Sequence, residues 1–80
     1  MKLWLLTQIA VRGYDTYDSC VVAAETEEAA KQIHPTGNPI GPEAGFFDWP
    51  TTSEQVSAVY LGEGDNGMPA GAICASFNAG

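Results

Sequence analysis

The sequence has few basic residues, which limits the partners that it can bind. Three Lys and Arg side chains stand against ten Asp and Glu, so the 80-residue chain carries a formal net charge of −7. Such a surface repels nucleic-acid backbones, and direct binding of DNA or RNA is disfavoured. Two interpretations stay open: the charge only keeps a small protein soluble, or it attracts a partner that has a basic patch.

Residues for catalysis and metal binding are also scarce. His34 is the only histidine, no Cys, Asp or second His lies close to it in the chain, and the two cysteines form no CxxC pair. Nucleophilic triads and zinc sites need such neighbours. We therefore expect no enzymatic activity, no metal and no cofactor. We interpret His34 as a residue at the end of a helix that satisfies the last carbonyl groups.

Long hydrophobic runs are absent too. No apolar stretch approaches the roughly 18 residues of a membrane span, and residues 3–6 are too few for the core of a signal peptide. We expect a single cytoplasmic domain, residues 1–80, that has no membrane partner. Cys20 and Cys74 both lie in apolar stretches, where reduced cysteines are small buried side chains as a rule. A disulfide between them stays open.

The stretch 17–34 organises the rest of the chain, because its pattern changes from strand to helix at Thr26. Residues 19–24 alternate as in a β-strand. Thr26 is a suitable N-cap for the helix that follows, and Pro35 ends that helix. A helix of about two turns is unstable alone, so it must be held by a sheet.

Three further stretches, 2–11, 56–61 and 72–77, have the pattern of strands. The first is apolar on both sides near its start, and we expect it to be central and covered on both faces. The whole pattern predicts an α+β domain of order β-β-α-β-β, with an antiparallel-rich sheet and one short helix on one face. The order of the strands within the sheet is not readable.

Residues 35–50 form a long segment rich in Pro and Gly, which excludes a helix or a central strand. Loops of this length inside small domains are often functional. Its aromatic residues, Phe46, Phe47 and Trp49, can plug the gap between helix and sheet or stack over the base of a ligand. We predict that at least one of them is inserted beside Ile33, and we keep all three as candidate binding residues.

The turn between the first two strands holds a second set of candidate ligand- or partner-binding residues: Arg12, Tyr14, Asp15, Tyr17 and Asp18. Tyrosine rings and a planar guanidinium suit a nucleotide-like ligand or a protein interface. The alternative is turn chemistry, in which the Asp side chains bond to the nearby backbone.

Five stretches of the chain carry recognisable motifs: 1–6, 13–19 (GYDTYDS), 21–25 (VVAAE), 33–35 and 76–80 (SFNAG). They resemble the motifs of a group of short, largely uncharacterised bacteriophage and prophage proteins. The resemblance implies a viral accessory protein that acts in the cytoplasm of a bacterial host. It implies no catalytic residue.

Three functions are consistent with these features. The first is a non-enzymatic accessory protein that inhibits a bacterial defence component by direct protein binding. The second is a homo-oligomeric sponge that sequesters a nucleotide-derived immune signal in a pocket lined by Arg12, Tyr14, Tyr17 and Trp49. The third is a structural or packing domain without a ligand. We favour the first, because an acidic surface with aromatic residues suits an interface with a basic partner.

Overall fold

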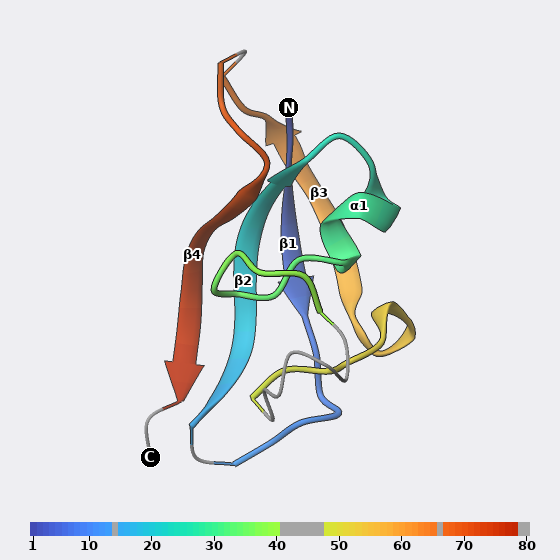
Figure 1. Cartoon of the computed structure of the whole chain (residues 1–80), viewed down its shortest axis with the longest axis vertical. Helices are drawn as coiled ribbons and strands as arrows, with labels where there is room; N and C mark the ends of the chain where they lie inside the picture. The colour runs from blue at the N-terminus through green and yellow to red at the C-terminus, as the bar shows by residue number, and fades with distance from the viewer. Residues whose placement is uncertain (14, 41–47, 66, 79–80) are drawn as a thin grey trace.

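Four antiparallel strands form the frame of the molecule (Figure 1). The computed structural model describes residues 1–13, 15–40, 48–65 and 67–78. Its strands are β1 (Lys2–Thr7), β2 (Thr16–Ala24), β3 (Ser57–Glu63) and β4 (Gly71–Asn78). The helix α1 (Glu27–Lys31) follows β2, and the 3-10 helix η2 (Ser53–Gln55) precedes β3. This is the small α+β domain with an antiparallel sheet and one short helix that the sequence pattern predicts.

The strand order in the sheet is β3-β1-β2-β4. The first hairpin therefore lies in the centre, and the two strands that come later in the chain lie at the edges. β1 and β2 pair in continuous register from Lys2–Ala24 to Thr7–Ser19. The pairings of β3 and β4 contain register shifts. Alternation shows which side chains share a face but not which strands are neighbours, so this order lay beyond the sequence pattern.

One face of the sheet is covered. In Figure 1, α1 and the described parts of the connection 32–56 lie in front of the strands. Both contribute to the core on this face, whose members are Leu6, Cys20, Val22, Ala24, Ala30, Trp49 and Val56. Ile33 packs against the same cluster. The predicted insertion of an aromatic residue beside Ile33 is therefore confirmed for Trp49, whereas Phe46 and Phe47 lie outside the described residues.

α1 begins as predicted and ends earlier. The Oγ1 of Thr26 accepts a hydrogen bond from the Ala29 N–H at 3.1 Å. The helix has five residues, about 1.4 turns, where about two turns were expected. The chain leaves it because the following residues fold back: the Ile40 N–H donates to the Gln32 carbonyl at 3.0 Å. No helix among the described residues is long and apolar enough to cross a membrane.

The opposite face of the sheet is the main departure from the prediction. β1 is central, but it ends at Thr7, and Leu6 is its one buried residue. Leu5 points the other way and is flanked by Val21 on β2 and Val59 on β3, and Val59 is 53% exposed. We call this side of the sheet the open face. The five-residue helix and the described parts of the connection after it pack with Leu6 on the covered face.

The two cysteines lie on neighbouring strands and differ in exposure. Both are free thiols, Cys20 buried and Cys74 exposed. The expectation of two buried side chains is therefore wrong for Cys74. β4 is an edge strand, and Cys74 pairs with Val21 in a row that belongs to the open face.

Candidate functional site

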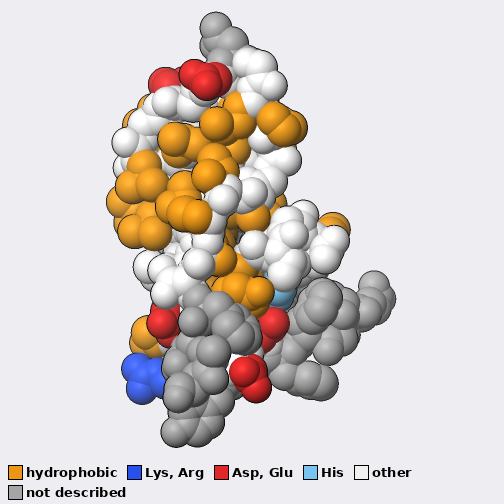
Figure 2. Space-filling view, turned by 90° about the vertical axis from the view of Figure 1, so that its left-hand side faces the viewer, with side chains coloured by type: hydrophobic (Ala, Val, Ile, Leu, Met, Phe, Trp, Pro, Cys, Tyr) orange, Lys and Arg blue, Asp and Glu red, His pale blue; other side chains and the backbone are white. Residues whose placement is uncertain are grey.

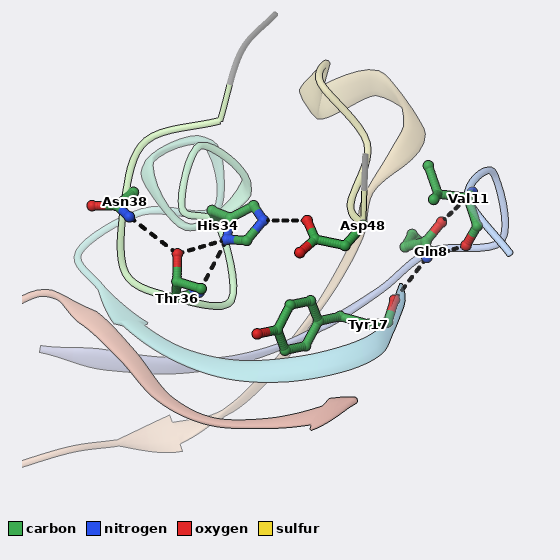
Figure 3. Close-up of polar contacts among 7 residues, drawn as sticks. All are labelled: Gln8, Val11, Tyr17, His34, Thr36, Asn38 and Asp48. Carbon is green, nitrogen blue, oxygen red and sulfur yellow. Dashed lines mark hydrogen bonds and ion pairs between the residues drawn. The ribbon is translucent and has the colours of Figure 1, made fainter. Parts of the chain in front are cut away.

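The turn between β1 and β2 is shaped by one buried side chain, Gln8. Its Nε2 donates to the carbonyls of Val11 at 2.7 Å and Tyr17 at 2.8 Å, and its Oε1 accepts from the Val11 N–H at 2.7 Å (Figure 3). A side-chain amide offers two N–H donors and an acceptor oxygen, and here both donors and the oxygen bond to the backbone. Thr16 adds a hydroxyl bond to the Gly13 carbonyl at 2.8 Å. We call this braced turn, residues 8–18, the hairpin end.

The hairpin end displays most of the residues predicted for it. Arg12, Asp15 and Asp18 are exposed, and Tyr17 is half-buried. Asp15 has a φ of 59°, in the left-handed region that Asp and Asn tolerate better than most residues. Tyr14 lies outside the described residues. The result is an exposed surface with two carboxylates on a backbone that is held from within.

His34 does not cap the helix, contrary to the sequence interpretation. It lies beyond the last residue of α1 and is 2% exposed. Its Nε2 lies 2.8 Å from the Asp48 Oδ1, and its Nδ1 lies 2.8 Å from the Thr36 Oγ1. Asp48 stands fourteen positions later in the sequence, so the absence of a local partner was misleading. The one feature of the sequence that could have indicated this contact is the presence of a His and an Asp at opposite ends of the proline-rich segment.

The hydrogen bonds fix the tautomer of His34. The Thr36 backbone N–H donates to Nδ1 at 3.1 Å, so in the neutral ring Nδ1 is the acceptor and Nε2 carries the proton toward Asp48. Asp48, His34 and Thr36 thus have the connectivity of a nucleophilic triad. Two features oppose that use: the Thr36 amide already occupies Nδ1, and the Asn38 Nδ2 donates to the Thr36 Oγ1 at 3.2 Å. The arrangement suits a structural brace.

This polar cluster ties the connection after α1 to the hairpin end. The Tyr17 N–H donates to the Asp48 carbonyl at 2.9 Å. The ring of Tyr17 stands edge-on to His34, with centroids 5.8 Å apart, and Figure 3 shows it below the His34–Asp48 contact. The start of β2 is therefore held by Gln8 on one side and by the His34–Asp48 pair on the other.

Trp49 is separated from the other candidate residues. It is 1% exposed in the core, and its Nε1 has no hydrogen-bond partner among the described residues. A residue in this position packs the fold and is not accessible as a lid over a base. Within the described ranges, no group of three or more His, Cys, Asp and Glu side chains could hold a metal ion.

Comparison with known proteins adds no assignment. No protein-family model, curated protein or solved structure matches the chain significantly. The function is therefore argued from the geometry of the site.

Proposed function

We propose that this protein is a non-enzymatic accessory protein of phage type, which binds a bacterial defence component in the host cytoplasm and inhibits it by direct contact. The main support for this proposal is the structure of the hairpin end. Asp15 and Asp18 are exposed there on a turn whose backbone is fixed by Gln8. A preformed turn loses little conformational entropy on binding, and its carboxylates suit a partner with a basic patch. The resemblance to short phage proteins supports the bacterial and antiviral-defence context.

The geometry gives less support to a nucleotide sponge. Trp49 is buried, so one of the four residues expected to line the pocket is not available to a ligand. A depression of about 190 Å³ does open on the other side of the sheet, but its lining residues are uncharged. Arg12 is the one cation in the hairpin end, and phosphates are usually held by several donors or cations.

The test combines a functional readout with matched charge changes. Bacterial strains that each carry one defence system are infected by a phage with and without the protein, and plating efficiency is measured. The double substitution Asp15→Asn and Asp18→Asn removes two charges, and Asn keeps the left-handed conformation at position 15 accessible. The control, Glu25→Gln with Glu28→Gln, removes the same charge from exposed positions beside and within α1.

We expect the wild type and the control to restore plating against at least one defence system, and the hairpin variant to lose this effect. The target, captured with the tagged protein and identified by mass spectrometry, should dissociate as salt rises, because exposed charge pairs are screened. Equal activity of the two double variants would refute the hairpin end as the contact. Failure of the wild type with every system would refute the proposed function itself.

A further inference from the structure

The open face is uncharged over its whole width. Two rows of directly paired residues cross the four strands, Val59–Leu5–Val21–Cys74 and Ser57–Thr7–Ser19–Ser76. Paired residues lie on one side of a sheet, so these eight form one continuous surface. None of them is charged, although the chain has a formal net charge of −7.

Acidic residues lie at both ends of the long axis of the molecule. Figure 2 views the molecule from the β4 side and shows hydrophobic side chains gathered between acidic groups above and below. In the sequence, Glu63 and Asp65 lie where β3 leads into the connection to β4, and Asp15 and Asp18 lie in the hairpin end. Two copies of the chain would therefore repel each other at the ends, while the centre of the open face adds no charge repulsion.

The size of this face is that of a weak dimer interface. Four strands about 4.8 Å apart and six residues long give a flat area of about 20 × 20 Å, on the order of 400 Å². Two such faces together would bury on the order of 800 Å², somewhat below the roughly 1,000 Å² of a stable specific interface, so the association is a weak one. The depression between β1, β2 and β4, about 190 Å³, gives side chains of a facing sheet a place to insert.

The edges of the sheet are less suited to association than its face. The β3 pairing shifts register between Leu3 and Trp4, and the β4 pairing shifts in two places. Gly62 in β3 and Gly71 in β4 also have positive φ values, 143° and 147°. Bulged, twisted edges pair poorly with another strand. A partner that needs a regular edge is therefore disfavoured relative to one that packs on the face.

We propose that the open face binds a second copy of this chain, so that two sheets pack face to face as a β-sandwich with two-fold symmetry. A second copy offers the same uncharged surface, with one apolar row and one row of Ser and Thr, and sheets pack in this way at about 10 Å separation with nearly aligned strands. Leu5 and Val21 lie near the centre of the interface and Val59 near its rim. The small area predicts a dimer in the micromolar range or weaker.

Salt separates this interface from the one proposed at the hairpin end. Rising ionic strength screens the repulsion between two chains of charge −7, so the dimer should become tighter. Binding of a basic partner at the hairpin end should become weaker under the same change. Dimerisation through the open face and partner binding at the hairpin end can therefore be tested, and refuted, separately.

Sedimentation velocity of the full chain, at concentrations up to about 500 µM and at low and high salt, tests the dimer. Val59→Lys places a cation on the open face at an exposed position. Ile9→Lys is the matched control, because Ile9 is also β-branched and is 77% exposed but lies outside the strands. Both substitutions make the chain less negative, so a loss of association cannot come from a greater net negative charge.

We expect the wild type to dimerise more tightly at high salt. Val59→Lys should raise the dissociation constant at least about 10-fold, since symmetry places the lysine twice in one interface, and Ile9→Lys should change it less than about 2-fold. Ser76→Lys, on the opposite edge strand, removes no apolar contact and should act like Val59→Lys. Ser76→Lys therefore tests whether the open face forms the dimer interface if Val59→Lys fails to fold. A wild type that stays monomeric at both salts, or a dimer that neither lysine on the open face weakens, would overturn the proposal.

Discussion

The two faces of the sheet are built from the same strands and have opposite surroundings. On the covered face, Leu6 and Val22 are fully buried beneath Trp49. On the open face, Leu5 and Val21 pair with each other and are partly exposed, and Val59 on β3 is half-exposed. Adjacent positions of one strand therefore differ in burial because α1 and Trp49 pack on the covered side.

This difference teaches that the apolar content of a small chain exceeds what its own second layer can cover. An 80-residue chain buries about 60–65% of the surface of its unfolded state, which leaves apolar surface exposed even in a stable domain. Here part of the excess lies on the open face, at Val59, and part lies elsewhere, at Ile9 and Tyr60. An apolar surface on an acidic protein is where association is expected.

The largest effect on stability should come from removing Trp49, which packs in the core of the covered face. Trp49→Ala should lower the free energy of unfolding by about 3–5 kcal/mol, because a large buried ring is lost and a cavity is left. Chemical denaturation measures this directly. Trp49→Phe is the control: it keeps most of the volume and removes an N–H that has no partner among the described residues, so it should lose much less. A Trp49→Ala variant as stable as the wild type would show that the cover is not anchored there.

The next effect compares two adjacent leucines, one on each face. Leu6→Ala should lower the free energy of unfolding by about 2–5 kcal/mol, the range for a fully buried leucine. Leu5→Ala should lower it by about half as much or less when measured at low protein concentration, since Leu5 is only partly buried in the monomer. At high concentration the loss for Leu5→Ala should grow, because the dimer is weakened as well. Equal losses at low concentration would mean that both faces are covered.

A smaller effect should follow from loosening the brace beside the covered face. Asp48→Ala leaves the buried Nε2–H of His34 without its acceptor, which should lower the free energy of unfolding by about 1–3 kcal/mol. Asp48→Asn keeps an acceptor oxygen and should lose less. Urea denaturation of the two variants gives the difference. The role assigned to the pair is refuted if Asp48→Ala and the wild type unfold at the same midpoint.

The last comparison is between the reactivities of the two cysteine thiols, where the smallest effect is expected. Burial, with a further contribution from nearby Cys74, raises the pKa of the Cys20 thiol from 9.0 to about 12. Thiolates are the reactive form, so iodoacetamide should modify exposed Cys74 in the native protein and Cys20 only after unfolding. Mass spectrometry after labelling counts the modified sites. Rapid double labelling of the native protein would contradict the assigned burial.

The same shift sets a pH dependence with a definite sign. Between about 9 and about 12 the unfolded chain has lost the Cys20 proton and the folded chain still holds it. The free energy of unfolding therefore falls as pH rises through this window and gains nothing from Cys20 below it. Cys20→Ser should flatten this part of the profile.

Local features of the fold could be predicted from the sequence. Thr26 signals a helix start because its hydroxyl meets an unpaired N–H three residues later, and the structure has this bond. Alternation located the strands because each side chain faces one side of a pleated sheet. Insertion of at least one of Phe46, Phe47 and Trp49 was expected because the helix is too short to cover a sheet unaided. For the helix start and the strands, the cause lies within a few residues of the effect.

Features that depend on distant contacts could not be predicted. The partner of His34 is Asp48, and no spacing rule links a residue after a helix to one before a 3-10 helix. Gln8 gave no signal either, since a buried amide that braces a turn looks like any polar residue at a strand end. The open face was missed because an apolar strand start has the same pattern whether one side or both are covered.

The strand order also sets the order in which the fold can form. β1 and β2 are joined by a short turn and make the centre of the sheet, while β3 and β4 must close loops of many more residues to reach its edges. Short loops close faster and at lower entropy, so the central hairpin is expected in the folding transition state and the edges after it. Substitutions in the hairpin should then slow refolding, and those in β3 or β4 should mainly speed unfolding, a division that stopped-flow kinetics resolves. During synthesis the hairpin leaves the ribosome before Trp49 and Val56, so the face that ends up covered stays exposed to solvent until the chain has passed them.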